Sequence, residues 1–173
     1  GVNTPEKIDY LLELRASNND AVEPYAARFN ATFVANRKPW EVEVDVAIPC
    51  AIQNELAGDD AKALAANGAK YVVEASNMGC TPDAVKVFED AGIPVAPGKA
   101  ANAGGVAVSG LEMSQNAMKL SWTREEVDTR LKQIMGNIHN ACVEQGTRSD
   151  GSVDYIRGAN IAGFRRVADA MLG

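Results

Sequence analysis

The sequence predicts an α/β fold with a mostly parallel sheet, followed by a helical C-terminal region. Up to Ala96, short runs rich in β-branched residues alternate with segments of helical periodicity. Some of these runs are continuously apolar, which is typical of strands buried on both faces of a parallel sheet. The 173 residues contain no internal repeat, low-complexity tract or linker, so we expect one domain over residues 1–173.

The N-terminal segment predicts two helices and a strand candidate. Thr4-Pro5-Glu6 combines a capping hydroxyl, a proline at the first helical position and an acid near the positive end of the helix dipole. A second short helix is expected over residues 22–29, and residues 31–35 (ATFVA) are a strand candidate.

The middle of the chain predicts three strands separated by two helices. Residues 42–48 alternate at first, become apolar and end at Pro49, as expected for a strand that enters a buried sheet. The pattern continues with a helix over 59–67, a strand over 70–75, a helix from Thr81 to Gly92 and a strand over 93–96. Strands and helices that alternate at these spacings favour a parallel α/β sheet.

The C-terminal part predicts helices only. A glycine-rich turn over 98–105 leads into a helix that reaches about Leu120, and Thr123-Arg124-Glu125-Glu126 has the pattern of a capping box. The helix after this box ends at Gly146, and a last helix is expected over 160–172. The residues expected to face inward are Val127, Leu131, Ile134, Ile138 and Cys142 in the first of these two helices, and Ile161, Phe164, Val167 and Met171 in the second.

Composition narrows the functional class. The net charge of −6 argues against a nucleic-acid partner, which would require clustered basic residues. No apolar run is long enough for a membrane helix, and we expect no membrane association. Three widely spaced cysteines without a CxxC pair fit a reducing cytoplasm, and a single histidine argues against a histidine-based metal site. These features predict a cytoplasmic globular protein without a metal.

Candidate ligand-binding residues follow the predicted strands. Ligands of open α/β sheets bind outside the carboxyl ends of the strands. The segments 49–55, 74–79 and 97–105 lie at these ends and combine small residues with amide side chains, including Asn77 and Asn102. Because a carboxamide both donates and accepts hydrogen bonds, such side chains suit a nicotinamide ring and ribose hydroxyls.

Each candidate also has an interpretation without function. Asn77 and Asn102 could form turns, because asparagine tolerates left-handed backbone. Ser109 could bond back to a helix carbonyl, and Lys99 could be a solvated surface charge. Cys50 and Cys80 are interpreted as small buried residues rather than nucleophiles.

The segment around Lys99 is not a phosphate-binding P-loop. The P-loop pattern requires a glycine five residues before the glycine of Gly-Lys and a hydroxyl residue after the lysine. Here Ile93 and Ala100 occupy these positions.

The stretch from Lys99 to Asn116 (KAANAGGVAVSGLEMSQN) closely resembles the C-terminal core of small hexameric glutamate dehydrogenases. The likeness extends nearly from end to end. The other matching stretches are Lys38 to Val42 (KPWEV), Ile48 to Ala51 (IPCA), Gln53 to Leu56 (QNEL), Leu120 to Thr123 (LSWT), Gly158 to Phe164 (GANIAGF) and Val167 to Met171 (VADAM).

The resemblance implies a reaction of amino acid metabolism and nitrogen assimilation. This reaction is the reversible oxidative deamination of L-glutamate to 2-oxoglutarate and ammonium, with hydride transfer to NADP, or alternatively to NAD. By position in the family, Asn102, Val106 and Ser109 would bind the substrate, with the Ser109 hydroxyl on its side-chain carboxylate. Asn102 would also lie by the nicotinamide.

The cofactor's ribose would be bordered by three residues, according to the same resemblance. These residues are Ala51, Ile52 and Asn77. Ile52 departs from the family, which usually has threonine there, so a side-chain hydroxyl is lost.

The resemblance also predicts what the chain lacks. We expect a Rossmann-like, doubly wound sheet that lacks the first two strands of the family's sheet. We also expect the chain to lack the glycine fingerprint that binds the pyrophosphate, and the substrate domain that carries the catalytic lysine and aspartate. No catalytic residue is therefore assigned in this chain, and we expect the isolated chain to be inactive. The alternative function is a non-catalytic nucleotide-binding or interaction module that reuses the fold.

The expected sheet has an exposed edge at residues 44–48. Full-length family members form homo-hexamers, and we expect the chain itself to associate through this edge or to cover it with a displaced segment.

Overall fold

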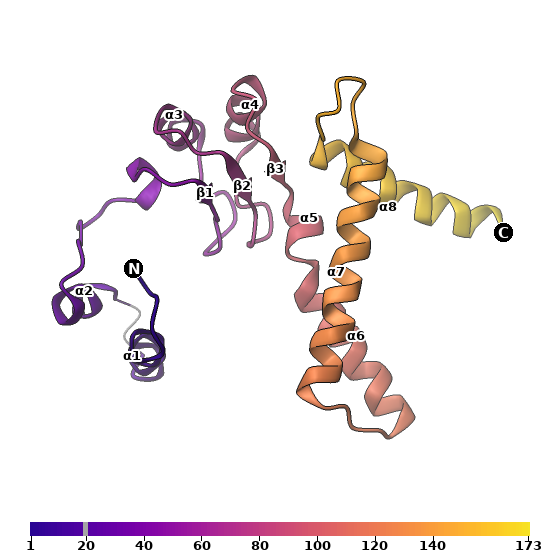
Figure 1. The fold of residues 1–173 in the computed structure, drawn as a ribbon, viewed down its shortest axis with the longest axis horizontal. Helices are drawn as coiled ribbons and strands as arrows, with labels where there is room; N and C mark the ends of the chain where they lie inside the picture. The colour runs from indigo at the N-terminus through magenta and orange to yellow at the C-terminus, as the bar shows by residue number, and fades with distance from the viewer. Residues whose placement is uncertain (19–20) are drawn as a thin grey trace. The chain divides into compact units, whose positions relative to one another are not determined.

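The computed structural model describes residues 1–18 and 21–173, which form two compact units, Gly1–Pro39 and Trp40–Gly173. Figure 1 traces the elements of both units in chain order.

The first unit is a pair of short helices, α1 (Pro5–Ala16) and α2 (Glu23–Phe29). The Tyr25 and Phe29 rings are 4.9 Å apart between centroids, and the Tyr10 ring meets Phe29 edge-on at 5.7 Å. The Arg28 guanidinium lies 4.3 Å from the centre of the Tyr10 ring. Aromatic and cation–π contacts therefore hold α2 against α1.

Two details of this unit differ from the sequence prediction. The helix begins after Thr4 as predicted, but the Thr4 side chain makes no capping hydrogen bond. The strand predicted over residues 31–35 is wrong, because this segment has no regular structure before a turn begins at residue 35. Phe33 is 41% exposed and Val34 58% exposed, so the segment buries too little apolar surface to be held as a strand.

The second unit contains a three-stranded parallel sheet in the order β1 (Val46–Ala47), β2 (Tyr71–Val73) and β3 (Val95–Ala96). Val46 pairs with Tyr71, and Val72 pairs with Val95. The prediction of a parallel α/β sheet is confirmed. All three strands are shorter than predicted, and β1 covers only the end of the predicted run 42–48.

The two helices that connect these strands build the core. Helices α3 (Gly58–Ala66) and α4 (Pro82–Asp90) lie side by side, as Figure 1 shows. The predicted cap of α4 is confirmed, because the Thr81 hydroxyl accepts a 3.2 Å hydrogen bond from the backbone N–H of Ala84. The largest fully buried residues of the unit are Phe88, Leu56, Leu64, Val72 and Pro49. Burying these side chains stabilises the unit through the hydrophobic effect.

The rest of the chain is helical, in agreement with the prediction. Helices α5 (Gly98–Ala101) and α6 (Ala103–Met118) follow β3, so the predicted turn over 98–105 is mostly helix. Helix α7 (Arg124–Gly146) begins at the predicted capping box. The Thr123 hydroxyl accepts from the Glu126 N–H at 3.2 Å, and the Glu126 carboxylate accepts from the Thr123 N–H at 2.7 Å. Its predicted inward residues are half-buried or buried.

Helix α8 (Tyr155–Leu172) packs along the end of α7 through two glycines. A Cβ atom on Gly158 would lie 2.0 Å from the Cys142 carbonyl oxygen, and one on Gly146 would lie 2.3 Å from the Asp154 carbonyl oxygen. Only glycine permits the two backbones to approach this closely.

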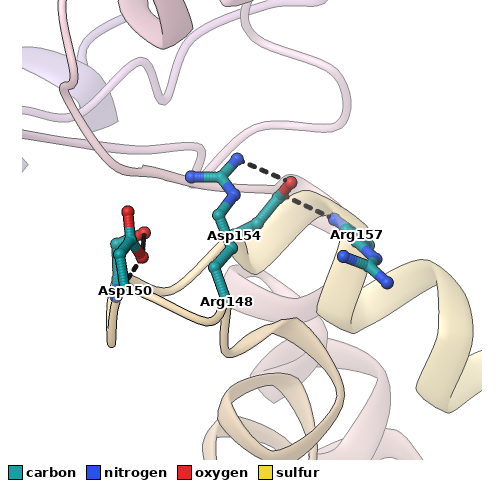
Figure 2. Close-up of polar contacts among 5 residues, drawn as sticks. Arg148, Asp150, Asp154 and Arg157 are labelled. Carbon is teal, nitrogen blue, oxygen red and sulfur yellow. Dashed lines mark hydrogen bonds and ion pairs between the residues drawn. The ribbon is translucent and has the colours of Figure 1, made fainter.

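The predicted start and inward face of α8 are both wrong. The helix begins five residues before the predicted Asn160, because the Asp154 carboxylate caps it by accepting from the Arg157 N–H at 2.9 Å, as Figure 2 shows. Asp154 also accepts a 2.9 Å hydrogen bond from the Arg148 guanidinium (Figure 2). Of the predicted inward residues only Ile161 is half-buried; the exposed ones are Phe164 (73%), Val167 (61%) and Met171 (82%).

Candidate functional site

An open cleft of about 700 Å³ lies at the carboxyl ends of β1 and β2. Its walls come from the segments after β1 and β2 and from the start of α6. The lining residues are Cys50, Ala51, Ile52, Gln53, Ala75, Ser76, Asn77, Asn102 and Val106. This is the position at which open parallel sheets bind their ligands.

Two asparagine side chains meet in this cleft. The Asn102 side-chain amide donates a 2.7 Å hydrogen bond to Oδ1 of Asn77. Neither residue is kept for a left-handed turn: Asn102 has φ −95°, and Asn77 is not among the described residues with positive φ, whereas Asn54 has φ +57°. Asn102 precedes α6 but its side chain caps no N–H of that helix. Both residues do lie in turns, as the turn interpretation predicts, but neither has a left-handed backbone.

The segments after β1 and β2 are joined along their backbones. The Asn54 N–H donates to the Met78 carbonyl at 2.8 Å, and the Leu56 N–H donates to the Gly79 carbonyl at 3.0 Å. The Ser76 hydroxyl donates to the Pro49 carbonyl at 3.2 Å. These bonds hold Ala51 and Ile52 on the same side of the cleft as Asn77.

Two glycines allow these segments to lie so close. A Cβ atom on Gly98 would lie 2.8 Å from the Ser76 carbonyl oxygen, and one on Gly79 would lie 2.7 Å from the Ser76 hydroxyl oxygen. Both distances are shorter than a side-chain carbon can accept, so the cleft depends on glycine at these positions.

One acidic side chain is buried beneath the cleft. Glu74 at the end of β2 is 6% exposed. Its carboxylate accepts from the Cys80 N–H at 2.8 Å and from the Gly98 N–H at 2.7 Å. The sequence analysis includes Glu74 in the segment 74–79 but gives it no role, although an acid that directly follows an apolar buried strand is an available signal of a special role.

The two cysteines nearest the cleft differ in exposure. Burial, reinforced by the nearby Glu74 carboxylate, raises the pKa of the Cys80 thiol to about 12. Cys80 is therefore a protonated, inert thiol, and its interpretation as a small buried residue is confirmed. The same interpretation is wrong for Cys50, which is exposed and lines the cleft.

The structure brings together five of the six site residues predicted from sequence. Ala51, Ile52, Asn77, Asn102 and Val106 all line the cleft.

Ser109 lies on α6 beyond the lining residues and is exposed. Its hydroxyl makes no hydrogen bond to another described residue, so the interpretation of a bond back to a helix carbonyl is wrong. Lys99 is exposed and donates to Asn160 of α8, in agreement with a surface charge.

None of the helices within residues 1–18 and 21–173 combines the length and the apolar character of a membrane-spanning segment. The same residues contain no group of three or more His, Cys, Asp or Glu side chains that could hold a metal ion.

A parallel sheet with an amide-lined cleft at its strand ends defines this protein as a Rossmann-like α/β domain. The chain belongs to the Glutamate/Leucine/Phenylalanine/Valine dehydrogenase family, whose model matches residues 1–173.

Within this family, the chain is similar to proteins named as glutamate dehydrogenases. The chain is 61% identical to the NAD-specific glutamate dehydrogenase of Bacteroides fragilis over 97% of its own length. It is 55% identical to the NADP-specific glutamate dehydrogenase of Salmonella typhimurium over 98% of its length. In both comparisons it spans 38% of the relative.

Solved structures give the same result. A glutamate dehydrogenase structure matches 99% of this chain with a TM-score of 0.94 and 46% identity, and the match covers 38% of that structure's chain. A hetero-hexameric glutamate dehydrogenase from Thermus thermophilus matches 86% of this chain and 35% of its own, with a TM-score of 0.71 and 25% identity.

Proposed function

We propose that the protein is part of a glutamate dehydrogenase, which converts L-glutamate reversibly into 2-oxoglutarate and ammonium with hydride transfer to a nicotinamide nucleotide. The family match, the identities of 61% and 55% to named glutamate dehydrogenases and the position of the cleft support this function.

The asparagine pair is the single observation that carries the proposal, because its free atoms fit a carboxamide. The hydrogen bond between the side chains uses the Asn102 amide nitrogen and the Asn77 oxygen. The Asn77 nitrogen and the Asn102 oxygen make no further hydrogen bond to a described residue. One free donor beside one free acceptor complements the nicotinamide carboxamide, which offers an acceptor and a donor in return.

The remaining site residues are assigned as the resemblance to the family implies. Ala51 and Ile52 line the same cleft as Asn77 and Asn102, and their backbone would border the ribose of the nucleotide. Val106 is one turn after Asn102 on α6, and Ser109 follows on the same helix face. The unpaired Ser109 hydroxyl would donate to the side-chain carboxylate of glutamate, and Val106 would pack against its methylene groups.

The catalytic acid and base must come from outside these cleft walls. Cys50 is the only ionisable side chain among the lining residues. We therefore propose that the 173 residues alone have no dehydrogenase activity, whereas the natural protein that contains them does. The chain spans 38% of its named relatives, which agrees with this division.

The experiment is a steady-state assay of reduced nucleotide formed from glutamate. The natural protein should turn over, and the isolated chain should not exceed background. An Asn102→Ala variant of the natural protein should lose about ten- to a hundredfold in kcat/KM, because one or two hydrogen bonds to the cofactor disappear. Ser114→Ala is the matched control, since the Ser114 hydroxyl bonds only to the Gly110 carbonyl of its own helix. Equal activity of Asn102→Ala and wild type would refute the assignment of the cleft.

The choice of nucleotide is a separate question. The resemblance found in the sequence favours NADP, whereas the 61% identical relative is named NAD-specific. We propose NADP with NAD as the alternative, and the ratio of kcat/KM for the two nucleotides in the natural protein decides between them.

We also propose a cytoplasmic location and a hexameric assembly for the natural protein. All three cysteines are free thiols, which fits a reducing compartment. A Thermus thermophilus relative is a hetero-hexamer by its description. Sedimentation of the natural protein tests the assembly.

A further inference from the structure

Glu74 has the surroundings of a structural clamp. Its carboxylate is buried, and each of its two oxygens accepts a short hydrogen bond from a backbone N–H, one of Cys80 and one of Gly98. No Lys or Arg among the described residues pairs with it. Because a buried carboxylate is costly without partners, these two N–H groups stabilise it, and the Cys80 thiol adds a further hydrogen bond.

The two N–H groups belong to the two segments that carry the asparagine pair. Cys80 lies three residues after Asn77, and Gly98 lies four residues before Asn102. The backbone N–H of Glu74 also donates to the Ala96 carbonyl of β3 at 3.0 Å. Glu74 is therefore bonded to β3, to the start of α5 and to the segment after β2 at once.

We infer that Glu74 is a positioning residue that sets the separation of Asn77 and Asn102 and thereby the fit of the nicotinamide carboxamide. A carboxylate is required because it offers two acceptor oxygens. Glutamine has one such oxygen, and its NH₂ group would face a backbone donor. Aspartate keeps both oxygens but is one methylene shorter, so it can reach only one of the two segments. The role in nucleotide binding rests on the proposed function, whereas the clamp itself rests on the geometry alone.

The experiment is a double-mutant cycle on the natural protein, with the dissociation constant of the reduced nucleotide measured by equilibrium titration. Glu74→Gln should raise this constant about tenfold, because one buried N–H loses its acceptor and the segments separate. KM for the nucleotide should rise with it, while kcat changes less. Asn77→Ala alone should also weaken binding. The dissociation constant of the double variant should be about equal to the larger of the two single-variant constants. The reason is that each change alone already disrupts the placement of the asparagine pair. Glu89→Gln, an exposed change on α4, is the matched control and should bind as wild type does.

Two results would overturn the inference. One is an unchanged dissociation constant in Glu74→Gln together with a lower thermal midpoint, which is what a merely structural residue produces. The other is strict additivity of the two changes in the double variant. If Glu74→Gln does not fold, Glu74→Asp is measured in its place, with the same direction expected and a smaller effect.

Hydrogen exchange keeps this inference separate from the proposed function. Without any nucleotide, peptides that cover Cys80 and Gly98 should exchange their amide protons at least about tenfold faster in Glu74→Gln than in wild type. Equal exchange rates would overturn the clamp even in an active enzyme. Absence of turnover and of nucleotide binding in wild type would refute the proposed function and leave the exchange result to decide the clamp.

Discussion

At the scale of single residues, the cleft depends on two glycines as much as on its polar side chains. Gly98 and Gly79 both lie against Ser76, whose carbonyl and hydroxyl oxygens occupy the space that a Cβ atom would need. Glu74 then uses the N–H of Gly98 as one of its two donors. Gly98 therefore has two roles: its missing side chain leaves space for Ser76, and its N–H donates to the Glu74 carboxylate.

Gly98→Ala tests this requirement. The new methyl group would lie 2.8 Å from the Ser76 carbonyl oxygen, so we expect a loss of about 1–3 kcal/mol in the free energy of unfolding. Gly136→Ala in α7 is the matched control, because its Cβ meets no atom within 4 Å and alanine should stabilise the helix by up to about 1 kcal/mol. Urea unfolding of the two variants measures both effects. A neutral Gly98→Ala would show that the segments have freedom to separate.

Cys80 gives a prediction for alkaline pH. Its thiol has a pKa of about 12 in the folded protein, above its ordinary value of 9.0. Between these values the unfolded chain loses the proton and the folded protein keeps it, so stability must fall as pH rises from 9 to about 12. The expected contribution is up to about 1.4 kcal/mol per pH unit. Because other groups titrate in this range, the measured quantity is the difference in unfolding free energy between wild type and Cys80→Ala. If the unfolding free energies of the two proteins change in parallel with pH, the buried Cys80 thiol is not the cause of the loss of stability.

At the scale of elements, the start of a helix is predictable where a capping residue stands directly before a clear helical pattern. Thr81 and Thr123 were identified because each stands directly before a helical pattern, and both make the expected bonds. The helix start at Asp154 is not predictable, because the residues that follow it show no clear helical period. These residues include Tyr155, Ile156 and Gly158. The pairing of Thr147 with Val153, directly before Asp154, joins residues of a loop and is likewise not visible in the sequence pattern.

Asp154→Ala should therefore shift the start of α8. The substitution removes the acceptor for the Arg157 N–H and the partner of Arg148, and we expect a loss of about 1 kcal/mol in stability. Asp150→Ala is the control, since Asp150 bonds only within its own loop, to Ser152. Thermal unfolding compares the two variants. Equal stability of both would mean that α8 is held by its packing on α7 and not by its cap.

The strands and the cleft show where sequence reasoning reaches its end. Alternation with helices was enough to predict three parallel strands, and the rule for strand ends was enough to place Asn77 and Asn102 on one edge. The length of each strand was not predictable, because it depends on pairing with a strand distant in the sequence, and β1 pairs with β2 only at Val46 and Ala47. The bond between the two asparagines and the clamp by Glu74 also depend on strand register, which joins residues 24 and 25 positions apart.

At the scale of the whole molecule, the sheet and α8 leave apolar surface uncovered. β1 has β2 as its one partner among the described strands, and Val46 and Ile48 are 43% and 50% exposed. Phe164, Val167 and Met171 form an exposed row along α8. A chain with such surfaces is expected to lower its free energy by association.

The 173 residues should accordingly sediment as a concentration-dependent mixture rather than as a monomer. A lysine at an edge strand opposes pairing with another edge, because its charge would be buried or brought next to a like charge. Val46→Lys in β1 should therefore shift the chain toward the monomer. Val42→Lys is the matched control, since Val42 is exposed in the same segment but lies outside the strand. If both variants associate as wild type does, the edge of the sheet is not the associating surface, and a third variant, Phe164→Lys on α8, locates it. A monomeric wild-type chain at all concentrations would contradict the prediction for both surfaces.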